Sequence, residues 1–301
     1  MDVHGRDLRY FVAVAEELHF TRAAERLFIS QPALSKQIRM LERTLGVALF
    51  ERDGRSVSLT TAGAALLPHA RTVLAAWDGG WQAVEQSKRS QDATLVVGMS
   101  TSPGRDGLLP AIRSRFSQAL PSARLALRQI GWEDPTAGLA DASCDIAFVW
   151  LPIPAPERYE WIVMAEEPCL VAMPQNHRLA VRPELDFADL LDEPFLALPD
   201  SAGPLRDYWL AIDQRAGRPA VIGGTISSPD ETYEALVGGQ GICLLAAGNA
   251  ASITRERVIT RTIHGVPPCK LALAWRKHDG NPLVLAYADA AARVVHAADR
   301  C

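Results

Sequence analysis

The sequence has no hydrophobic stretch long enough to cross a membrane. Its apolar runs are interrupted well short of the about 20 residues that a transmembrane helix needs. The first residues, MDVHGRDLRYF, also lack the hydrophobic core of a signal peptide. We therefore expect a protein without a membrane partner that stays in the cytoplasm. Its 301 residues are enough for two or three compact units, each with its own core.

Cysteine is scarce and histidine is scattered, which argues against a disulfide or metal framework. There are five cysteines, and four of them open or interrupt apolar stretches such as CDIAFVW and CLVAM. That setting favours small buried side chains. A redox switch is the alternative, although no two cysteines are closely spaced in a polar loop. The seven histidines occur singly, so we expect no bound metal and no cofactor. The four cysteines are Cys144, Cys169, Cys243 and Cys269.

Positive charge is not in excess, since the formal net charge is -4. Taken alone, this argues weakly against a nucleic-acid partner. The charge is unevenly distributed, however, within the first 60 residues. Acidic residues come first, at Asp2, Asp7, Glu16, Glu17 and Glu25, and a basic cluster follows at Lys36, Arg39, Arg43, Arg52 and Arg55.

Residues 21–46, TRAAERLFISQPALSKQIRMLERTLG, predict two short helices joined by a tight turn. Ser30 is a candidate cap for the second helix, Pro32 suits its first turn, and Gly46 ends it. Its apolar residues form one stripe, made of Leu34, Ile38, Leu41 and Leu45. Its polar residues lie mainly away from that stripe, at Gln31, Ser35, Lys36, Arg39 and Arg43. This pattern indicates a helix-turn-helix, and the alternative is an ordinary amphipathic helix with a solvated basic face.

Residues 50–53 and 57–59 predict two short strands joined by a turn, a wing with Arg52 and Arg55 near its tip. From about Leu8 to Gly63, and above all in SQPALSKQIRMLERTLGVALFERDGRSVSLTTAG, the sequence resembles the LysR-type family of bacterial transcriptional regulators. Length and downstream organisation agree with that family over essentially the whole chain. The resemblance implies an α+β, multidomain protein: an N-terminal winged helix-turn-helix, a long linker helix and a C-terminal two-lobed α/β effector domain like periplasmic binding proteins.

The helix-turn-helix assigns the expected DNA contacts. Gln31, Pro32 and Ser35 should read bases in the major groove, whereas Lys36 and Arg39 should hold phosphates. Arg55 in the wing should reach the adjacent minor groove or backbone. The expected DNA-binding set is completed by Thr21, Ser30 and Arg52.

Residues 61–90 predict a long helix, with Thr60 or Thr61 as its cap. Apolar side chains recur along it at steps of three and four, at Leu66, Ala70, Val73, Trp77, Trp81 and Val84. Such a stripe requires a partner helix, so we predict that two copies associate here, as a homodimer or within a homotetramer. Packing against its own domain is the alternative. Pro68 and the pair Gly79-Gly80 are expected to bend or weaken the helix.

Residues 87–92, SKRSQD, predict a hinge, after which strands and helices alternate as in a parallel sheet. The predicted strands are 93–99, 123–130, 144–150, 169–173, 221–226, 242–245 and 271–276. The predicted helices are 108–119, 136–142, 205–216, 231–238 and 282–298. We divide the chain into a DNA-binding domain (1–60), a linker helix (61–90) and an effector-binding domain (91–301). Lobe I of the last is 93–163 with 268–301, and lobe II is 164–267.

Ligands of such two-lobed folds gather in the cleft, at strand ends and helix N-termini. Ser100, Thr101 and Ser102 follow the first strand, where the family usually has a Ser or Thr that hydrogen-bonds the effector. Ser227 and Ser228 belong to a capping-box signature in lobe II and could face the cleft from the other side, although each serine alone is more often only a cap.

The sequence departs from the family pattern after the second strand of lobe I. The family often has a Ser or Thr after a glycine, whereas here Gly131 is followed by Trp132. This predicts either a narrowed pocket that selects a flat or small ligand, or a reshaped loop in which the family's chemistry fails. Trp150 ends the next strand and suggests an aromatic lining, and Pro199 completes the expected effector-binding set.

The function predicted is a sequence-specific transcriptional regulator, not an enzyme, whose DNA affinity or bending is set by a small-molecule inducer. Its expected partners are double-stranded promoter or operator DNA, a second copy of the chain and RNA polymerase. A regulator of the same fold that needs no ligand is one alternative. An enzyme using the cleft is another, but the sequence has no G-x-S-x-G elbow and no His in the strand-end loops.

Overall fold

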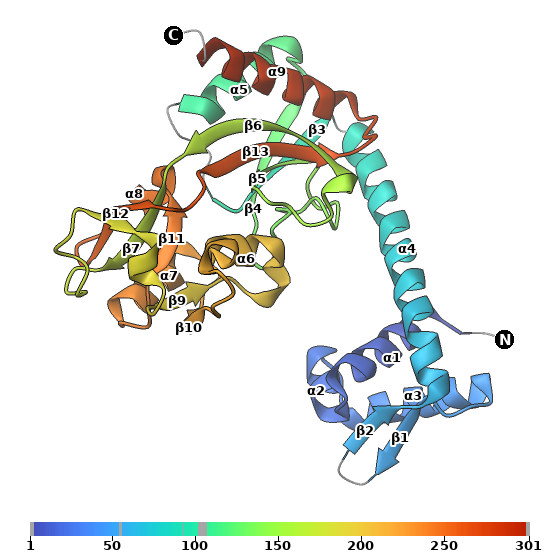
Figure 1. Ribbon diagram of the computed structural model, residues 1–301. Helices are drawn as coiled ribbons and strands as arrows, with labels where there is room; N and C mark the ends of the chain where they lie inside the picture. The colour runs from blue at the N-terminus through green and yellow to red at the C-terminus, as the bar shows by residue number, and fades with distance from the viewer. Residues whose placement is uncertain (1–2, 54–55, 92, 102–106, 299–301) are drawn as a thin grey trace. The chain divides into compact units, whose positions relative to one another are not determined.

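The computed structural model describes residues 3–53, 56–91, 93–101 and 107–298. Two residues of the predicted sites, Arg55 and Ser102, and the side chain of Arg52 lie outside what is described. The chain divides into two compact units, Met1–Val84 and Glu85–Cys301 (Figure 1).

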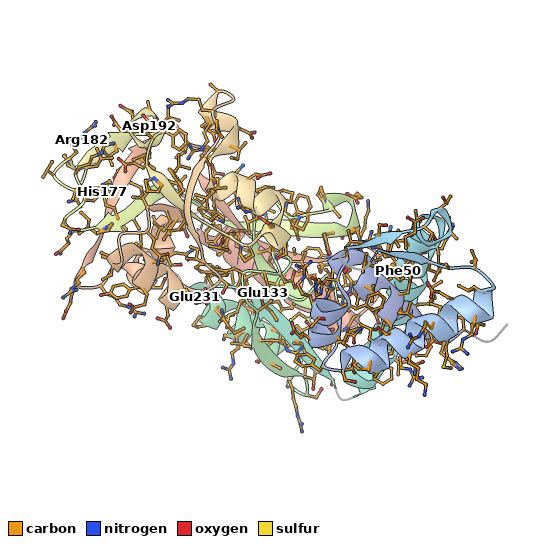
Figure 2. All side chains as sticks on the ribbon, turned by 90° about the horizontal axis from the view of Figure 1, so that it is seen from below. Phe50, Glu133, His177, Arg182, Asp192 and Glu231 are labelled. Carbon is orange, nitrogen blue, oxygen red and sulfur yellow. The ribbon has the colours of Figure 1, made fainter. Side chains whose placement is uncertain are left out.

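The first unit contains the predicted helix-turn-helix and wing. Its helices are α1 (Gly5–Glu17), α2 (Phe20–Arg26) and α3 (Gln31–Leu45), followed by the antiparallel strands β1 (Phe50–Asp53) and β2 (Ser56–Leu59). The apolar stripe of α3 is confirmed, since Leu34 and Ile38 are fully buried. Phe50 joins the wing to this core, with its ring 5.5 Å from that of Phe11 and 6.0 Å from that of Phe20 (Figure 2).

Polar contacts fix the wing to the helices on either side of it. Glu42 on α3 accepts hydrogen bonds from the amides of Leu49, at 2.9 Å, and Phe50, at 3.2 Å. The Thr60 hydroxyl caps the next helix by accepting from Gly63 N at 3.0 Å, which confirms the predicted cap. A Cβ on Gly63 would lie 2.2 Å from the Leu49 carbonyl oxygen, so only glycine permits this close approach.

Helix α4 (Thr61–Gln91) continues for 31 residues. It passes through Pro68 and the Gly79-Gly80 pair without interruption, so the expected weakening does not break it. Ala70 is buried in the first unit, but Val73 is 52% exposed and Trp77 is 67% exposed. The apolar stripe is therefore buried at Ala70 and exposed at Val73 and Trp77.

Lobe I of the second unit is a five-stranded sheet with the order β4-β3-β5-β13-β6. Its strands are β3 (Thr94–Met99), β4 (Arg124–Gln129), β5 (Ile146–Trp150), β6 (Tyr159–Glu167) and β13 (Cys269–Arg276). The first three are parallel, as predicted, whereas β13 runs antiparallel to β5 and β6. Helices α5 (Leu108–Ala119) and α9 (Pro282–Ala298) lie together over the sheet (Figure 1).

Lobe II contains a four-stranded sheet, β11-β7-β12-β8, and a parallel pair, β9 and β10. The strands are β7 (Cys169–Pro174), β8 (Glu184–Asp186), β9 (Pro194–Ala197), β10 (Val221–Thr225), β11 (Cys243–Ala246) and β12 (Val258–His264). The helices are α6 (Pro204–Trp209), α7 (Pro229–Val237) and α8 (Ala250–Ile253). Because β7 is antiparallel to both β11 and β12, the parallel sheet expected here is wrong.

Two predicted helices and one boundary need correction. Residues 136–142 form turns, because the Asp134 carboxylate accepts from the amides of Thr136 and Gly138, at 2.9 and 2.7 Å, and holds a local loop. The helix expected over 205–216 ends at Trp209, since Ala211 adopts a φ of 50°. Strand β6 reaches Glu167, beyond the expected lobe boundary at 163.

The four cysteines placed in apolar stretches are all buried, which confirms that part of the prediction. The fold nevertheless brings two of them together, although their spacing in the sequence gives no hint of it. Cys169 opens β7 and Cys269 opens β13, on the two crossovers between the lobes. The hydrogen bond with Cys269, together with burial, raises the pKa of the Cys169 thiol and keeps it protonated.

Candidate functional site

The outer face of α3 presents polar side chains at its N-terminal half. Gln31, Pro32, Lys36 and Arg39 are all exposed. Within the described part of the chain, no carboxylate pairs with Lys36 or Arg39. Both cations are therefore available to an anionic partner.

The arginines of the neighbouring helices are, by contrast, neutralised within the unit. Arg22 lies 3.3 Å from Glu17, and Arg26 lies 2.9 Å from Glu16. Glu16 is also 3.0 Å from Arg71 of α4. Burial acts to raise the pKa of Glu16, but the hydrogen bonds from Arg71 and Arg26 outweigh it and lower that pKa. The acidic residues that precede α3 thus compensate α2 and α4, and leave α3 positive.

Ser35 was expected to read bases, but the structure places it at the edge of the buried stripe, only 7% exposed. It precedes Ile38 by three positions, which brings it to the same side of the helix. Its hydroxyl accepts a hydrogen bond of 2.9 Å from the Gln31 side-chain amide. Ser35 therefore orients Gln31 and does not face outward itself.

The Ser30 prediction also needs correction, because its hydroxyl makes no capping bond to α3. A capping oxygen accepts from the second or third amide of the helix, and Pro32 has no N–H at the second position. Ser30 is exposed at the helix N-terminus, as Thr21 is on α2. Gly46 ends α3 in the left-handed conformation, as predicted, with φ 71°.

Phe28, in the turn between α2 and α3, is a residue that the sequence reasoning missed. It is 96% exposed and has a φ of 54°. An aromatic side chain in a left-handed turn costs strain and gains no burial in the free protein. Its position beside the start of α3 adds it to the candidate DNA-binding surface.

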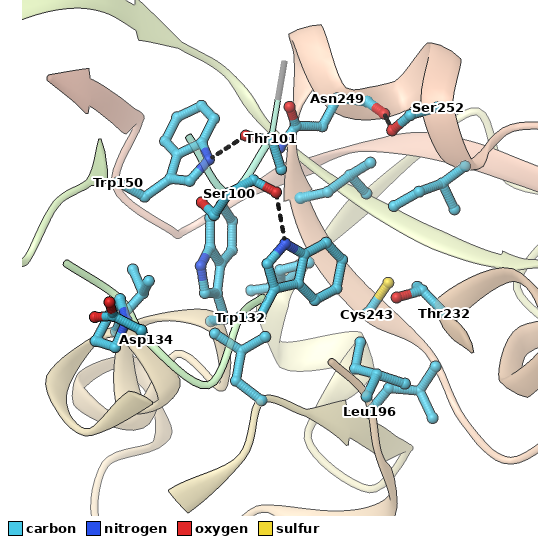
Figure 3. A pocket seen from close by; sticks show the side chains of 18 residues that line it. Ser100, Thr101, Trp132, Asp134, Trp150, Leu196, Thr232, Cys243, Asn249 and Ser252 are labelled. Carbon is cyan, nitrogen blue, oxygen red and sulfur yellow. Dashed lines mark hydrogen bonds between the residues drawn. The ribbon is translucent and has the colours of Figure 1, made fainter. Parts of the chain in front are cut away.

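A cavity lies between the two lobes of the second unit (Figure 3). Lobe I contributes Ser100, Thr101, Trp132, Asp134, Pro135 and Trp150. Lobe II contributes a mainly apolar wall, made of Leu196, Leu198, Leu205, Trp209, Ile226, Thr232, Cys243, Leu244, Leu245, Asn249, Ser252 and Ile253. The cavity therefore lies where the sequence predicts a ligand, at the strand ends between two lobes.

Two tryptophans of lobe I are held by hydrogen bonds at the cavity wall. The Trp132 indole donates to the Ser100 carbonyl oxygen at 3.1 Å, and the Trp150 indole donates to the Thr101 hydroxyl at 3.1 Å (Figure 3). Trp150 also meets Trp209 of lobe II edge to face, with 5.9 Å between ring centroids. The aromatic lining expected from Trp132 and Trp150 is thus present and is extended by a third ring.

The structure places four of the predicted effector residues in this cavity: Ser100, Thr101, Trp132 and Trp150. Gly131, Pro199, Ser227 and Ser228 are not among its lining residues. The two serines are used instead to cap α7. The Ser228 hydroxyl accepts from Glu231 N at 3.3 Å, and the Ser227 hydroxyl donates to the Glu231 carboxylate at 2.6 Å (Glu231 is labelled in Figure 2).

Neither a metal centre nor a membrane span was found in the described residues. No group of three or more His, Cys, Asp or Glu side chains there is arranged to hold a metal ion. None of the described helices has both the length and the apolar character needed to cross a bilayer.

Family models match both units of the chain. Residues 6–64 match the bacterial regulatory helix-turn-helix protein model of the lysR family, and residues 88–295 match the LysR substrate binding domain. The chain belongs to the LysR family of bacterial transcriptional regulators. It is therefore a sequence-specific DNA-binding regulator with a domain for a small-molecule effector between two α/β lobes, and the fold class predicted from the sequence is confirmed.

Characterised and uncharacterised LysR-family relatives align over most of the chain. The HTH-type transcriptional regulator AlsR of Bacillus subtilis is 30% identical over 286 residues, covering 93% of this chain and 92% of that protein. The uncharacterised regulator YnfL of Escherichia coli is 32% identical over 295 residues, covering 92% and 94%.

Full-length LysR-family structures share the fold. Full-length BenM is 28% identical, with a TM-score of 0.54 over 99% of this chain and 98% of that one. CbnR, solved in complex with its target DNA, is 24% identical, with a TM-score of 0.51, and the match covers 97% of this chain and 100% of that one.

Proposed function

We propose that this LysR-family regulator places the N-terminal half of α3 in the major groove of a promoter or operator. Gln31 and Pro32 touch base edges there, and Lys36 and Arg39 contact phosphates. The observation that carries this proposal is the charge arrangement: Lys36 and Arg39 lack carboxylate partners among the described residues, whereas Arg26 is paired. Thr21, Ser30 and Phe28 extend the same contact surface. Arg52 and Arg55, which lie outside the described side chains, are kept as further proposed DNA contacts.

The double variant Lys36→Ala/Arg39→Ala should weaken cognate and random DNA alike. Each phosphate contact releases about one counterion when the protein binds DNA. Losing two contacts should therefore reduce the slope of log affinity against log salt concentration by about two. The operator is selected from a random DNA pool with the wild-type protein, and binding is titrated at several salt concentrations.

Arg26→Ala is the matched control, since it removes an arginine that Glu16 and Glu17 already neutralise. It should leave the slope near the wild-type value. An unchanged slope in the double variant, or an equal change in Arg26→Ala, would place the phosphate contacts elsewhere.

The cavity between the lobes is proposed as the effector site, with Ser100, Thr101, Trp132 and Trp150 in contact with the ligand. It supports binding and not catalysis. No histidine is among its described lining residues, and the carboxylate there, Asp134, already accepts hydrogen bonds on both oxygens. A nucleophile and base pair thus has no counterpart in this lining. We propose no cofactor besides the effector.

A second copy of the chain is the proposed partner of α4. Val73, Trp77 and Val84 are 50% or more exposed at helical spacing, a pattern that a partner helix would cover. The assembly is a homodimer or a tetramer built from it. As a regulator of promoters, the protein is proposed to act in the cytoplasm and to contact RNA polymerase.

Val73→Ser/Trp77→Ser should shift the protein from its assembled form toward the monomer. The reason is that the two substitutions remove apolar area that only a partner can bury. Light scattering at matched concentrations measures the mass, and circular dichroism verifies the helix. Ala75→Ser, on the opposite side of α4, is the control. A double variant with the wild-type mass would show that another surface holds the copies together.

A further inference from the structure

Trp132 connects the two lobes from inside the cavity (Figure 3). Its indole N–H donates to Ser100 O of lobe I at 3.1 Å, and its backbone N–H donates to Ser227 O of lobe II at 3.3 Å. Its ring packs against the hydrophobic cores of both lobes. Trp132 thus makes the contacts that a ligand bound between the lobes would make.

Little space remains beside this ring. The cavity volume is about 70 Å³, whereas a dry apolar cavity of about 150 Å³ takes up benzene. A ligand with one or two rings fits only if a lining side chain moves. Trp132 is the candidate because a loop carries it and it is only partly buried, whereas Trp150 lies within β5 and is 3% exposed.

The charge of the lining restricts the ligand further. No Arg, Lys or His is among the lining residues that the structure describes. Asp134 is the charged group there, and Thr136 and Gly138 satisfy its oxygens. The indole N–H groups of Trp132 and Trp150 already donate within the protein. A carboxylate bound here would lose its hydration and find no cation among the lining residues that the structure describes, whereas the Ser100 and Thr101 hydroxyls can donate equally well to an uncharged acceptor.

The other lining side chains favour a ligand with an apolar aromatic ring. Leu196, Leu205 and Ile226 of lobe II face the tryptophans of lobe I across the cavity. Trp150 and Trp209 meet at 77°, an arrangement that leaves ring faces and edges for a further aromatic group. We propose that the effector cavity takes an uncharged, planar aromatic ligand, and that the Trp132 side chain is its built-in competitor. This proposal rests on the assignment of the cavity as the effector site.

The test of the competitor is Trp132→Ala in the full-length protein, with indole as the probe. The substitution opens a space the shape of the probe, so calorimetry should give an affinity for indole at least about tenfold tighter than in the wild type. Trp161→Ala is the control, because Trp161 lies on β6, is 38% exposed and does not line the cavity. It should behave as the wild type. Equal indole affinity in Trp132→Ala and the wild type would overturn the proposal.

The test of the charge uses benzamide, benzoate and benzamidine, which are matched in size and are neutral, anionic and cationic. Benzamide should bind Trp132→Ala at least about tenfold more tightly than benzoate does. Benzoate binding as tight as benzamide binding, or benzamidine binding tighter than it, would overturn the selection of an uncharged ligand. If Trp132→Ala does not fold by circular dichroism, Trp132→Phe takes its place, and failure of benzamide to outcompete benzoate there counts equally against the proposal.

Operator binding separates this inference from the assigned function. If indole binds Trp132→Ala but leaves its operator affinity unchanged, the cavity is a ligand site but does not act as an effector site. If no neutral probe binds while operator affinity matches the wild type, the proposal of an uncharged aromatic ligand is wrong, and the DNA-binding role is unaffected.

Discussion

Gln31→Ala should weaken binding to the cognate operator by about 1–3 kcal/mol and change binding to random DNA far less. Gln31 is the first residue of α3, at the end that enters the major groove in helix-turn-helix proteins. An amide at that position can pair with two atoms of an adenine edge, and its loss removes discrimination between bases.

The contact with Ser35 explains why this side chain is suited to reading a base. The Gln31 amide nitrogen carries two hydrogens, and one is directed to the Ser35 hydroxyl at 2.9 Å. The second hydrogen and the amide oxygen remain to face an adenine, so the side chain is oriented before DNA arrives. Less rotamer freedom is then lost on binding.

Ser35→Ala is the informative companion of Gln31→Ala. It frees the Gln31 side chain but leaves the amide in place, so it should reduce operator affinity by less and keep the base preference. Both variants are titrated against the operator and against operators changed at single positions. If Gln31→Ala weakens random DNA as much as the operator, the N-terminal end of α3 does not read bases.

The first unit could be predicted from the sequence because its signals are local. The stripe of Leu34 and Ile38, the glycine at 46 and the threonine cap at 60 each depend on neighbours a few residues away. The errors arose at the edges of these patterns. Ser35 is polar but lies at the edge of the buried stripe, and Ser30 stands at the N-cap position but makes no capping hydrogen bond.

In the second unit, some features depend on packing between distant elements and could not be predicted from local sequence patterns. Trp132 and Trp150 could be assigned to the cavity because they follow or end predicted strands. The lobe II wall, including Trp209 and Leu205, depends on how α6 packs against the other lobe, and no spacing in the sequence encodes that. Strand β12 was missed because only Val258 and Ile263, the first and the last but one of its residues, are buried, so it has no alternating pattern.

The second large effect, a loss of stability, is expected on substitution of Arg215 in lobe II, whose side chain is 1% exposed. Its Nε donates to Leu210 O at 2.8 Å, and its guanidinium carbon lies 4.6 Å from the centre of the Phe195 ring and 5.4 Å from that of Phe187. No carboxylate among the described residues pairs with it, and its Nη2 has no hydrogen-bond partner there. Burial accordingly lowers the pKa of Arg215.

Arg215→Ala should destabilise the second unit by about 3–5 kcal/mol, as expected for truncating a large buried side chain. It leaves a cavity beside Phe187 and Phe195 and deprives the Leu210 carbonyl of its donor. Arg215→Met keeps most of the volume and removes a desolvated charge, so its cost should be about 2 kcal/mol or less. Urea unfolding of the full-length protein, followed by tryptophan fluorescence, measures both. Because a methionine cannot donate a hydrogen bond, equal losses in the two variants would show that the donor bonds and the contacts with the phenylalanine rings, and not packing, hold this part of lobe II together.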